Sequence, residues 1–231
     1  MHVQAQVALF DIEGTIGSIA FVHDVLFPYA RERIDAFVRD RRDEPRVRSL
    51  LDATARDSGV DVHDLPAIVR VLHEWSDADY KIGPLKELQG MIWKAGFESG
   101  TLKAELYEDA VDAMRRYRLT GVRLYVYSSG SVEAQQLLFG HSIFGDLRPL
   151  FGGYFDTAIG RKRDPSSYRR IAEAIGIAPA GVVFFSDHVA ELDAAREADM
   201  QTVQLARPQD GVVAAKHHPA TESFEGIEVL R

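Results

Sequence analysis

A short, largely apolar run that stops at a polar loop occurs three times along this chain. The runs cover residues 7–10, 122–127 and 182–185, and the residues that follow them are mainly acids and serines. Runs of this length, rich in Val, Leu, Tyr and Phe, are typical of strands buried on both faces. A further strand is predicted over residues 201–205. The chain is therefore expected to build a buried sheet.

Helical patterns follow the later strands. In the clearest of them, apolar residues at positions 168, 171, 172 and 175 share one face of a helix. Asp164 is a suitable N-cap, Pro165 suits the first helical position, and Gly176 stands where a helix often ends. Strands that alternate with helices predict an α/β fold, with a doubly wound, mainly parallel, Rossmann-like sheet covered on both faces.

Residues 17–102 differ from the rest of the chain. They contain no comparable strand run, but several helical patterns, one of which places apolar residues 85, 88, 92 and 95 on a single face. We interpret this stretch as a helical domain inserted after the first strand, acting as a cap over the strand ends. The catalytic core is then formed by residues 1–16 and 103–231. No structure is predicted for the tail after Pro208.

Composition narrows the choice of partners. The 231 residues carry a formal net charge of −8 with a pI near 5.5, which makes nucleic acid or an anionic membrane a poor match. The absence of cysteine excludes disulfides and thiolate catalysis. No apolar run approaches the roughly 18 residues of a spanning helix, and no basic stretch precedes the first strand. We expect a cytoplasmic protein.

Reactive side chains stand at three of the predicted strand ends. Asp11 and Glu13 follow the first strand, Ser128 and Ser129 the second, and Asp187 the third. Ligands of an open parallel sheet bind beyond the carboxyl ends of its strands, so these groups are expected to converge. Carboxylates that meet need a cation, and oxygen ligands favour a hard, partly hydrated Mg²⁺ that also binds a phosphate oxygen.

Asp11 and Glu13 each have an expected role if the reaction is phosphoryl transfer. Asp11, at the end of its strand, is the expected nucleophile, and Glu13 can act as general acid and then as general base. The transferred phosphate also needs a positive side chain. Arg161, Lys162 and Arg163 are all available, and charge alone does not choose among them.

The segment Asp11-Ile12-Glu13-Gly14-Thr15 resembles the first motif of the haloacid dehalogenase superfamily, which normally reads Asp-x-Asp-x-Thr. Glutamate at the second acidic position is similar to one branch, the enolase-phosphatases of methionine salvage. The likeness runs from about residue 7 to residue 208. It includes residues 21–22 and 25–29, 88–90 with 92–93, 127–132, 154–157, Lys162 with 167–168, and 186–187 with 191–195.

The resemblance implies a two-step reaction at a single Mg²⁺ ion. The diketone 2,3-diketo-5-methylthiopentyl-1-phosphate is enolised, and the enol phosphate is then hydrolysed to an acireductone. The metal ligands carried over by the resemblance are Asp11, Glu13 and Asp187, with Glu13 using its side chain or its backbone carbonyl. The resemblance also implies a monomer.

The phosphate-binding residues follow from the same resemblance. Ser128 and Ser129 are implied to bind the substrate phosphate, and Lys162 is selected over its two arginine neighbours. Four positions depart from the family pattern, and they put the fine shape of the pocket in question. They are Ile16 in place of a common threonine, Asp164 in place of glutamate, His188 in place of an apolar residue, and Asp199 in place of glycine at a helix end.

Other conspicuous residues have a structural interpretation. Trp75 and Trp93 could line the substrate pocket, but we expect both to pack in the insertion. His217 and His218 could bind a metal ion, but two adjacent histidines in a tail usually do not. The arginines between residues 31 and 42 alternate with acids, which suggests a solvated helix face.

Two alternatives to the enolase-phosphatase hypothesis stay open. The first is a phosphatase for another small phosphate monoester, such as a sugar phosphate. The second is a phospho-accepting signalling receiver, which also places an acid, a hydroxyl and a lysine at strand ends. A receiver is about half this length and needs an open surface, so the helical insertion argues against it.

Overall fold

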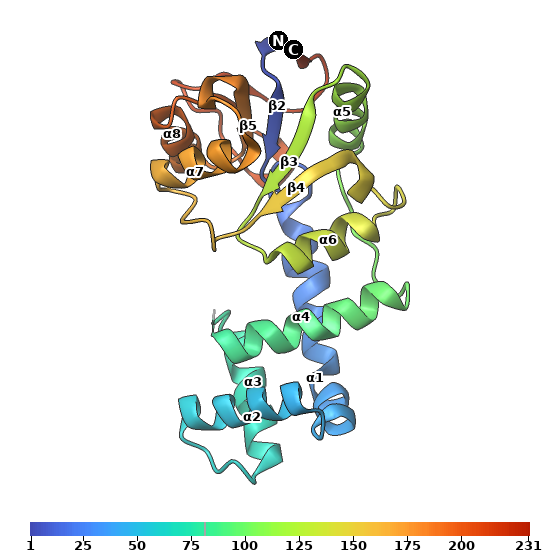
Figure 1. Cartoon of the computed structure of the whole chain (residues 1–231). Helices are drawn as coiled ribbons and strands as arrows, with labels where there is room; N and C mark the ends of the chain where they lie inside the picture. Colours follow the sequence, from blue (N-terminus) through green and yellow to red (C-terminus); the bar gives the residue numbers. More distant parts are fainter. Residues whose placement is uncertain (81) are drawn as a thin grey trace. The chain divides into compact units, whose positions relative to one another are not determined.

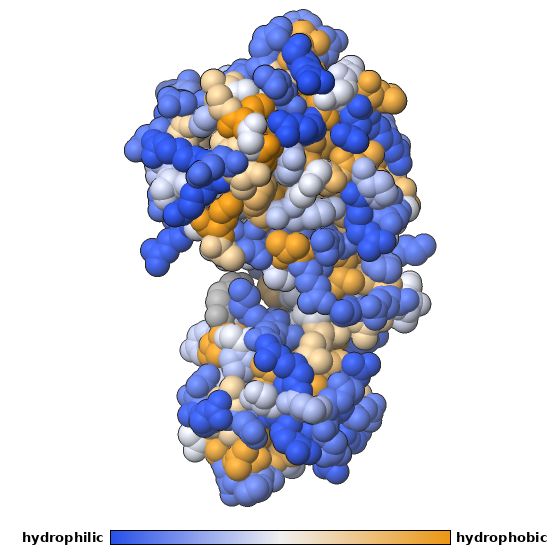
Figure 2. Space-filling model, in the orientation of Figure 1, coloured by the Kyte–Doolittle hydropathy of each residue, from blue (hydrophilic) through white to orange (hydrophobic). Residues whose placement is uncertain are grey.

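The computed structural model of the protein describes residues 1–80 and 82–231, which form two compact units (Figure 1). The first unit combines Met1–Ile19 with Lys103–Arg231, and the second consists of Ala20–Leu102. The first is an α/β unit and the second is helical. On the face that Figure 2 shows, hydrophilic residues cover most of each unit and hydrophobic residues occur in scattered groups.

A six-stranded sheet forms the centre of the α/β unit. Its strand order is β4-β3-β2-β5-β6-β7, and all of its pairings are parallel. Numbered along the chain, this is the 3-2-1-4-5-6 order of a doubly wound fold, which confirms the predicted fold class. The strands are β2 (Val7–Phe10), β3 (Arg123–Tyr127), β4 (Phe151–Phe155), β5 (Val182–Ser186), β6 (Gln201–Leu205) and β7 (Ala220–Thr221).

Strand β2 is buried along its whole length, yet its side chains still alternate between the two faces of the sheet. Ala8 and Phe10 belong to the apolar cluster on one face, and Val7 and Leu9 to the cluster on the other. A strand covered on both faces needs apolar residues at every position. This explains why β2 has a continuous apolar sequence.

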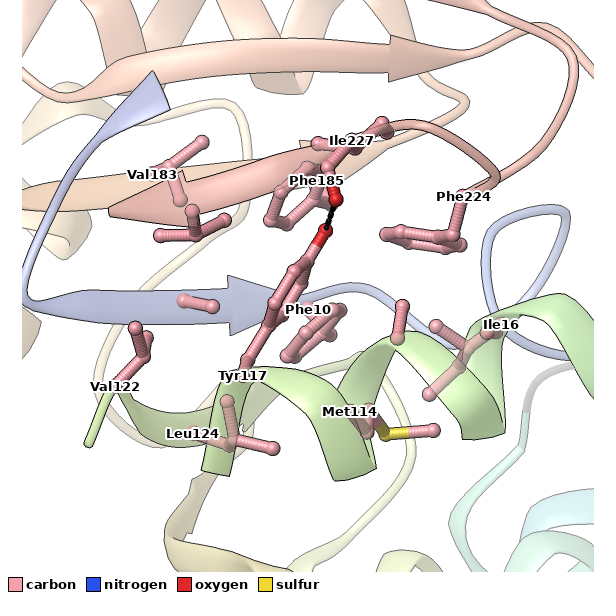
Figure 3. Packing of buried hydrophobic residues seen from close by; sticks show 14 of the residues in the cluster. Phe10, Ile16, Met114, Tyr117, Val122, Leu124, Val183, Phe185, Phe224 and Ile227 are labelled. Carbon is pink, nitrogen blue, oxygen red and sulfur yellow. Dashed lines mark hydrogen bonds between the residues drawn. The ribbon is translucent and has the colours of Figure 1, made fainter. Parts of the chain in front are cut away.

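Helix α5 (Glu108–Leu119) packs on one face of the sheet. Figure 3 shows Tyr117 from this helix reaching between Phe185 and Ile227, where its hydroxyl donates a hydrogen bond to the Ile227 carbonyl at 3.1 Å. Burial raises the pKa of this hydroxyl, which therefore stays protonated. Phe224, from the tail, completes the same cluster. The tail is thus part of the core.

Helices α7 (Pro165–Ile175) and α8 (Val189–Glu197) pack on the other face. The prediction for α7 is confirmed at both ends. The Asp164 carboxylate accepts a hydrogen bond from the Ser166 amide at 2.8 Å, and Gly176 ends the helix with φ of 74°. The remaining helix of this unit is α6 (Val132–Gly140), and short 3₁₀ turns cover Arg148–Leu150, Pro179–Gly181 and Pro208–Asp210.

Strand β4 was not predicted, because Gly152 and Gly153 interrupt its apolar pattern. A Cβ on Gly152 would lie 2.9 Å from the ring of Tyr125 on the neighbouring strand, so glycine makes room for that ring. The pairing with β3 also shifts register here. The tail adds β7 and β8 (Glu228–Leu230), and β8 pairs with β1 (His2–Gln4) in a separate parallel pair.

The helical unit has its own apolar core. It contains a π-helical turn (Phe21–Leu26), α1 (Phe27–Arg41), α2 (Pro45–Ser58), α3 (Leu65–Asp77) and α4 (Gly83–Glu98). Of the predicted apolar face, Leu85, Leu88 and Ile92 are buried in this core, and Ala95 is half-buried. Trp75 and Trp93 pack against it, and the Trp93 indole donates to the Leu26 carbonyl at 2.7 Å. Among the described residues, no helix is long and apolar enough to cross a membrane.

Asp210, in the tail, binds the two parts of the α/β unit that lie next to the insertion in the sequence. Its Oδ1 accepts hydrogen bonds from the Ser18 hydroxyl at 3.3 Å and the Ile19 amide at 3.1 Å. Its Oδ2 accepts one from the Tyr107 hydroxyl at 2.6 Å. The chain therefore leaves the α/β unit and returns to it beside a single carboxylate.

Candidate active site

The carboxyl ends of β2, β3 and β5 bring the predicted site residues to one edge of the sheet. Asp11 follows β2, Ser128 follows β3, and Asp187 follows β5. Phe10 and Phe185 are register partners, and the Asp11 amide donates to the Phe185 carbonyl at 2.9 Å, so β2 and β5 end at the same level. In the strand order found here, the direction of winding reverses between these two strands, which is where ligands bind in such sheets.

Lys162 contacts the expected nucleophile directly. Its Nζ atom lies 2.6 Å from Asp11 Oδ1 and 2.6 Å from Glu191 Oε2. All three side chains are nearly buried, with exposed fractions of 10%, 8% and 12% for Lys162, Asp11 and Glu191. Burial disfavours the ammonium, but the two carboxylates outweigh it and raise the pKa of Lys162. The lysine is therefore a fixed positive charge beside Asp11.

The two neighbouring arginines do not make this contact. The Arg163 guanidinium is instead 3.0 Å from His188 Nε2. The Tyr168 hydroxyl, held on α7, donates to the Lys162 carbonyl at 2.7 Å and fixes the loop that carries the lysine. The sequence left three cations open, and the resemblance selected the one that the fold brings to Asp11.

Two buried residues of the cluster were given no role from the sequence. The Ser186 hydroxyl donates to Asp11 Oδ2 at 3.0 Å and accepts from the His188 amide at 3.1 Å. Glu191 is the second partner of Lys162, and burial together with the Asp11 charge raises the pKa of Glu191. Glu191 lies in the first turn of α8, where an acid is common for reasons of helix stability alone, so the sequence did not single it out.

Asp187 is set against the loop that follows Asp11. Its amide donates to Thr15 Oγ1 at 3.0 Å, and its carbonyl accepts from Gln204 Nε2 at 3.1 Å. A Cβ on Gly14, where φ is 67°, would lie 2.7 Å from Asp187 Oδ2, so only glycine fits here without displacing the carboxylate. Burial and the Asp11 charge raise the pKa of Asp187 to about 7.

This repulsion between Asp11 and Asp187 fits a cation site. A buried acid whose pKa is raised by burial and by a neighbouring carboxylate has an unmet need for positive charge, and a divalent ion meets it with oxygen ligands. Glu13 lies in the same loop and is exposed. Its backbone and its side chain both stay possible donors to such an ion.

The two serines after β3 differ in exposure. Ser128 is buried, and its hydroxyl accepts from the Gly130 amide at 3.2 Å, which shapes the loop. Ser129 is exposed and lines a pocket of about 550 Å³ whose other lining residues are Thr157, Arg161, Lys162, Arg163, Asp164 and Glu191. A larger pocket, in the helical unit around the end of α2, has none of the predicted site residues in its lining.

The positions that depart from the family pattern have local explanations. Ile16 is fully buried in the core, and Asp164 caps α7. Asp199 adopts the left-handed conformation with φ of 65°, which Asp tolerates better than most residues. His188 precedes α8, and burial lowers its pKa, so it is neutral at physiological pH.

Comparison with known proteins identifies relatives over nearly the whole chain. Residues 5–199 match a family of hydrolases described as haloacid dehalogenase-like. The chain is 50% identical to "Enolase-phosphatase E1" of Thioalkalivibrio sulfidiphilus, over 97% of this chain and 99% of the relative. It is 51% identical to the protein of the same name from Azotobacter vinelandii, over 95% and 96%.

A solved structure gives the same result for the fold. The UTR4 protein of Saccharomyces cerevisiae superimposes with a TM-score of 0.82 at 34% sequence identity, over 96% of this chain and 99% of that one. The likeness covers the helical unit as well as the sheet. The comparisons therefore favour the first of the three functional hypotheses over a signalling receiver.

Proposed function

Because the chain belongs to the haloacid dehalogenase-like hydrolases and, within them, to the enolase-phosphatase E1 family, we propose that it catalyses the two-step reaction of that family. The substrate is 2,3-diketo-5-methylthiopentyl-1-phosphate, and the products are the acireductone 1,2-dihydroxy-3-keto-5-methylthiopentene and phosphate. The reaction belongs to methionine salvage. Enolisation precedes hydrolysis of the phosphate ester.

The observation that carries the proposal is the contact between Lys162 and Asp11. A lysine from the loop before α7 and an acid from the end of β2 meet at 2.6 Å in a nearly buried position. Burying a charged side chain is costly unless an opposite charge and hydrogen bonds compensate for the lost water. The ammonium of Lys162 is compensated in this way, and it places positive charge where a phosphate would dock. A loop lysine without a functional role would normally extend into solvent.

In the proposed hydrolytic step, an Asp11 carboxylate oxygen attacks phosphorus and forms an aspartyl phosphate. Ser186 and the Ile12 amide, which donates to Asp11 Oδ1 at 2.8 Å, orient the carboxylate. Glu13 protonates the departing enol oxygen and later takes a proton from the water that releases phosphate. Both roles need a group that exchanges protons with solvent, and Glu13 is exposed.

We further propose a single Mg²⁺ ion held by Asp11, Asp187 and either the side chain or the backbone carbonyl of Glu13. When bound, the ion supplies positive charge that stabilises phosphate and enolate oxygens. Lys162, Ser128 and Ser129 are proposed to hold the phosphate, with Lys162 compensating charge at the oxygens nearest Asp11.

The helical unit, residues 20–102, is proposed to act as a cap that recognises the carbon chain of the substrate. The chemical groups described above all come from the α/β unit, so substrate selection is the task left for the insertion. We also propose that the protein is a cytoplasmic monomer, which gel filtration with light scattering would test as a mass of about 25.8 kDa.

The test is to supply the diketone phosphate and record two signals together. The ultraviolet band of the enediol should rise, and one phosphate should be released for each product molecule formed. Omission of Mg²⁺ should remove both signals. Phosphate release without any enediol, together with comparable turnover of unrelated sugar phosphates, would support a general phosphatase instead.

A further inference from the structure

A cluster of three potential metal ligands lies away from the residues assigned to the reaction. Asp193 comes from α8, and His217 and His218 come from the segment before β7. The Asp193 Oδ1 atom is 3.2 Å from His217 Nε2 and 3.1 Å from His218 Nε2. Among the described residues, this is the one group of three histidine, cysteine or acidic side chains whose potential ligand atoms all lie within 4.8 Å of one another. The sequence separates the acid from the histidines by more than twenty positions, so the pattern was not visible there.

These separations agree with the geometry of a coordinated ion. Zinc binds imidazole nitrogen and carboxylate oxygen at about 2.0–2.2 Å in a tetrahedral arrangement, which places neighbouring ligand atoms about 3.3 Å apart. The two nitrogen–oxygen distances are close to that value, and the two imidazole nitrogens lie within 4.8 Å of each other, so closure of the two rings around an ion would complete the geometry. Three protein ligands would leave a fourth position for water.

His218 is held in the orientation that a ligand requires. Its side chain is fully buried, and its other ring nitrogen, Nδ1, lies 2.9 Å from the Thr202 hydroxyl on β6. Metal-binding histidines commonly have such a partner on the second nitrogen, which fixes the ring and leaves Nε2 for the metal. Burial also lowers the pKa of His218, so the ring is neutral at physiological pH, as a ligand must be.

Arg196 is a positive side chain in contact with the cluster. Its guanidinium donates to Asp193 Oδ1 and to the His217 carbonyl, both at 2.9 Å. The arginine and both imidazole nitrogens contact the same oxygen, Oδ1, so when an ion binds there the guanidinium has to transfer to Oδ2 of the same carboxylate. Arg196 also holds the His217 backbone against α8, which positions the tail before any ion binds.

We propose that Asp193, His217 and His218 form a binding site for a divalent transition-metal ion of the zinc class. Imidazole ligands favour Zn²⁺, Co²⁺, Ni²⁺ or Cu²⁺ over Mg²⁺, which distinguishes this site from one built only of oxygen ligands. The bound ion would join the tail to α8. Because none of the three residues is assigned a role in the reaction, occupancy is expected to leave Mg²⁺-dependent turnover unchanged.

Cobalt provides the probe, because tetrahedral Co²⁺ absorbs visible light when it is bound by imidazole. The protein, saturated with Mg²⁺, is titrated with CoCl₂, and Zn²⁺ is then added in competition. We expect one equivalent of Co²⁺ with visible absorption, displaced by one equivalent of Zn²⁺. His217→Ala removes a half-exposed ligand and should weaken binding at least tenfold, with normal folding and phosphatase activity.

Two further variants keep the test decisive. Asp193→Asn should also weaken binding at least tenfold, while His63→Ala, an exposed histidine of the helical unit, should leave it unchanged. Co²⁺ affinity that is the same in wild type, His217→Ala and Asp193→Asn would overturn the proposal, because the ion would then occupy another site. Absence of any visible absorption at millimolar Co²⁺ would overturn it as well.

Discussion

The α/β unit buries charged side chains at the end of its sheet, whereas the helical unit keeps its charges on the surface. Among the described residues of the helical unit, the buried polar side chains are Thr54 and Gln89, both neutral. The α/β unit buries Asp11 and Glu191 around Lys162, and it also buries Arg207 against Asp109 at 2.9 Å.

The buried charges around Lys162 belong to the proposed chemistry, whereas the buried Arg207–Asp109 pair joins segments of the fold. Removing a charge from water costs several kcal/mol before partners compensate, so buried charges persist where something else depends on them. In the α/β unit, Lys162, Asp11 and Glu191 create a strong local electric field at the proposed phosphate site. The helical unit packs apolar faces together and needs no such arrangement.

The largest expected effect is at the proposed nucleophile. Asp11→Asn keeps the shape of the side chain but replaces the carboxylate by an amide, which is a poor nucleophile for phosphorus. Phosphate release should fall by at least about 1,000-fold, as for other nucleophile variants. The measurement is steady-state phosphate release, with circular dichroism to confirm folding. Near-normal release would remove Asp11 from its assigned role.

The second expected effect distinguishes Lys162 from its neighbours. Lys162→Ala removes the charge beside Asp11 and should lower kcat/KM by about 100- to 1,000-fold. Arg161→Ala and Arg163→Ala are matched controls from the same pocket lining, and each should cost less than about tenfold. If either arginine variant lost as much activity as the lysine variant, the selection of Lys162 would be wrong.

The third effect concerns pH. A raised pKa near 7 means that the Asp187 carboxyl binds a proton below neutrality, and Mg²⁺ must displace that proton. Apparent Mg²⁺ affinity should therefore fall about tenfold for each pH unit below 7 and level off above it. Titration calorimetry between pH 5.5 and about 8.5 measures this, and a flat profile would contradict the assigned ligand.

The same group affects the metal-free protein with the opposite sign. Its pKa in the folded state lies above the ordinary value of 3.8, so protonation favours the folded state. This contribution is present at low pH and is lost as the pH rises through about 7. Mg²⁺ should therefore stabilise the protein against heating more at pH 8 than at pH 6.

The smallest expected effect is in the helical unit. Arg46 pairs with Glu87 across α2 and α4, but their side chains are 63% and 46% exposed. Arg46→Ala should lower the free energy of unfolding by less than about 1 kcal/mol and leave kcat unchanged. Urea unfolding and steady-state kinetics provide the two measurements. A large loss of activity would show that surface charges of the insertion take part in catalysis.

The sequence predicted the parts of the fold that depend on local pattern. The largely apolar runs identified β2, β3 and β5, a further strand was predicted at β6, and the caps at Asp164 and Gly176 identified both ends of α7. Strand β4 escaped because Gly152 gives no apolar signal, and its reason for being glycine is the ring of Tyr125 in another strand. Phe224 likewise becomes a core residue only through tertiary packing.

In the candidate site, too, residues marked by a local sequence pattern were predicted and residues placed by tertiary contacts were not. Asp11, Ser128 and Asp187 could be predicted because each lies within two residues of the end of a largely apolar run. Lys162 lies in a polar loop, where nothing local distinguishes it from two arginines, so only the family resemblance selected it. Ser186 escaped because a serine at the end of a strand is common, and its role depends on a strand from the other end of the chain.

The most direct test of the account is a crystal structure with Mg²⁺ and beryllium fluoride, which mimics a phosphoryl group on a carboxylate. We predict a beryllium–oxygen bond to Asp11, one Mg²⁺ ion bound by Asp11 and Asp187, and the Lys162 ammonium against a fluorine atom. Beryllium fluoride bound to a residue other than Asp11, or a Mg²⁺ ion that does not contact Asp187, would contradict the account.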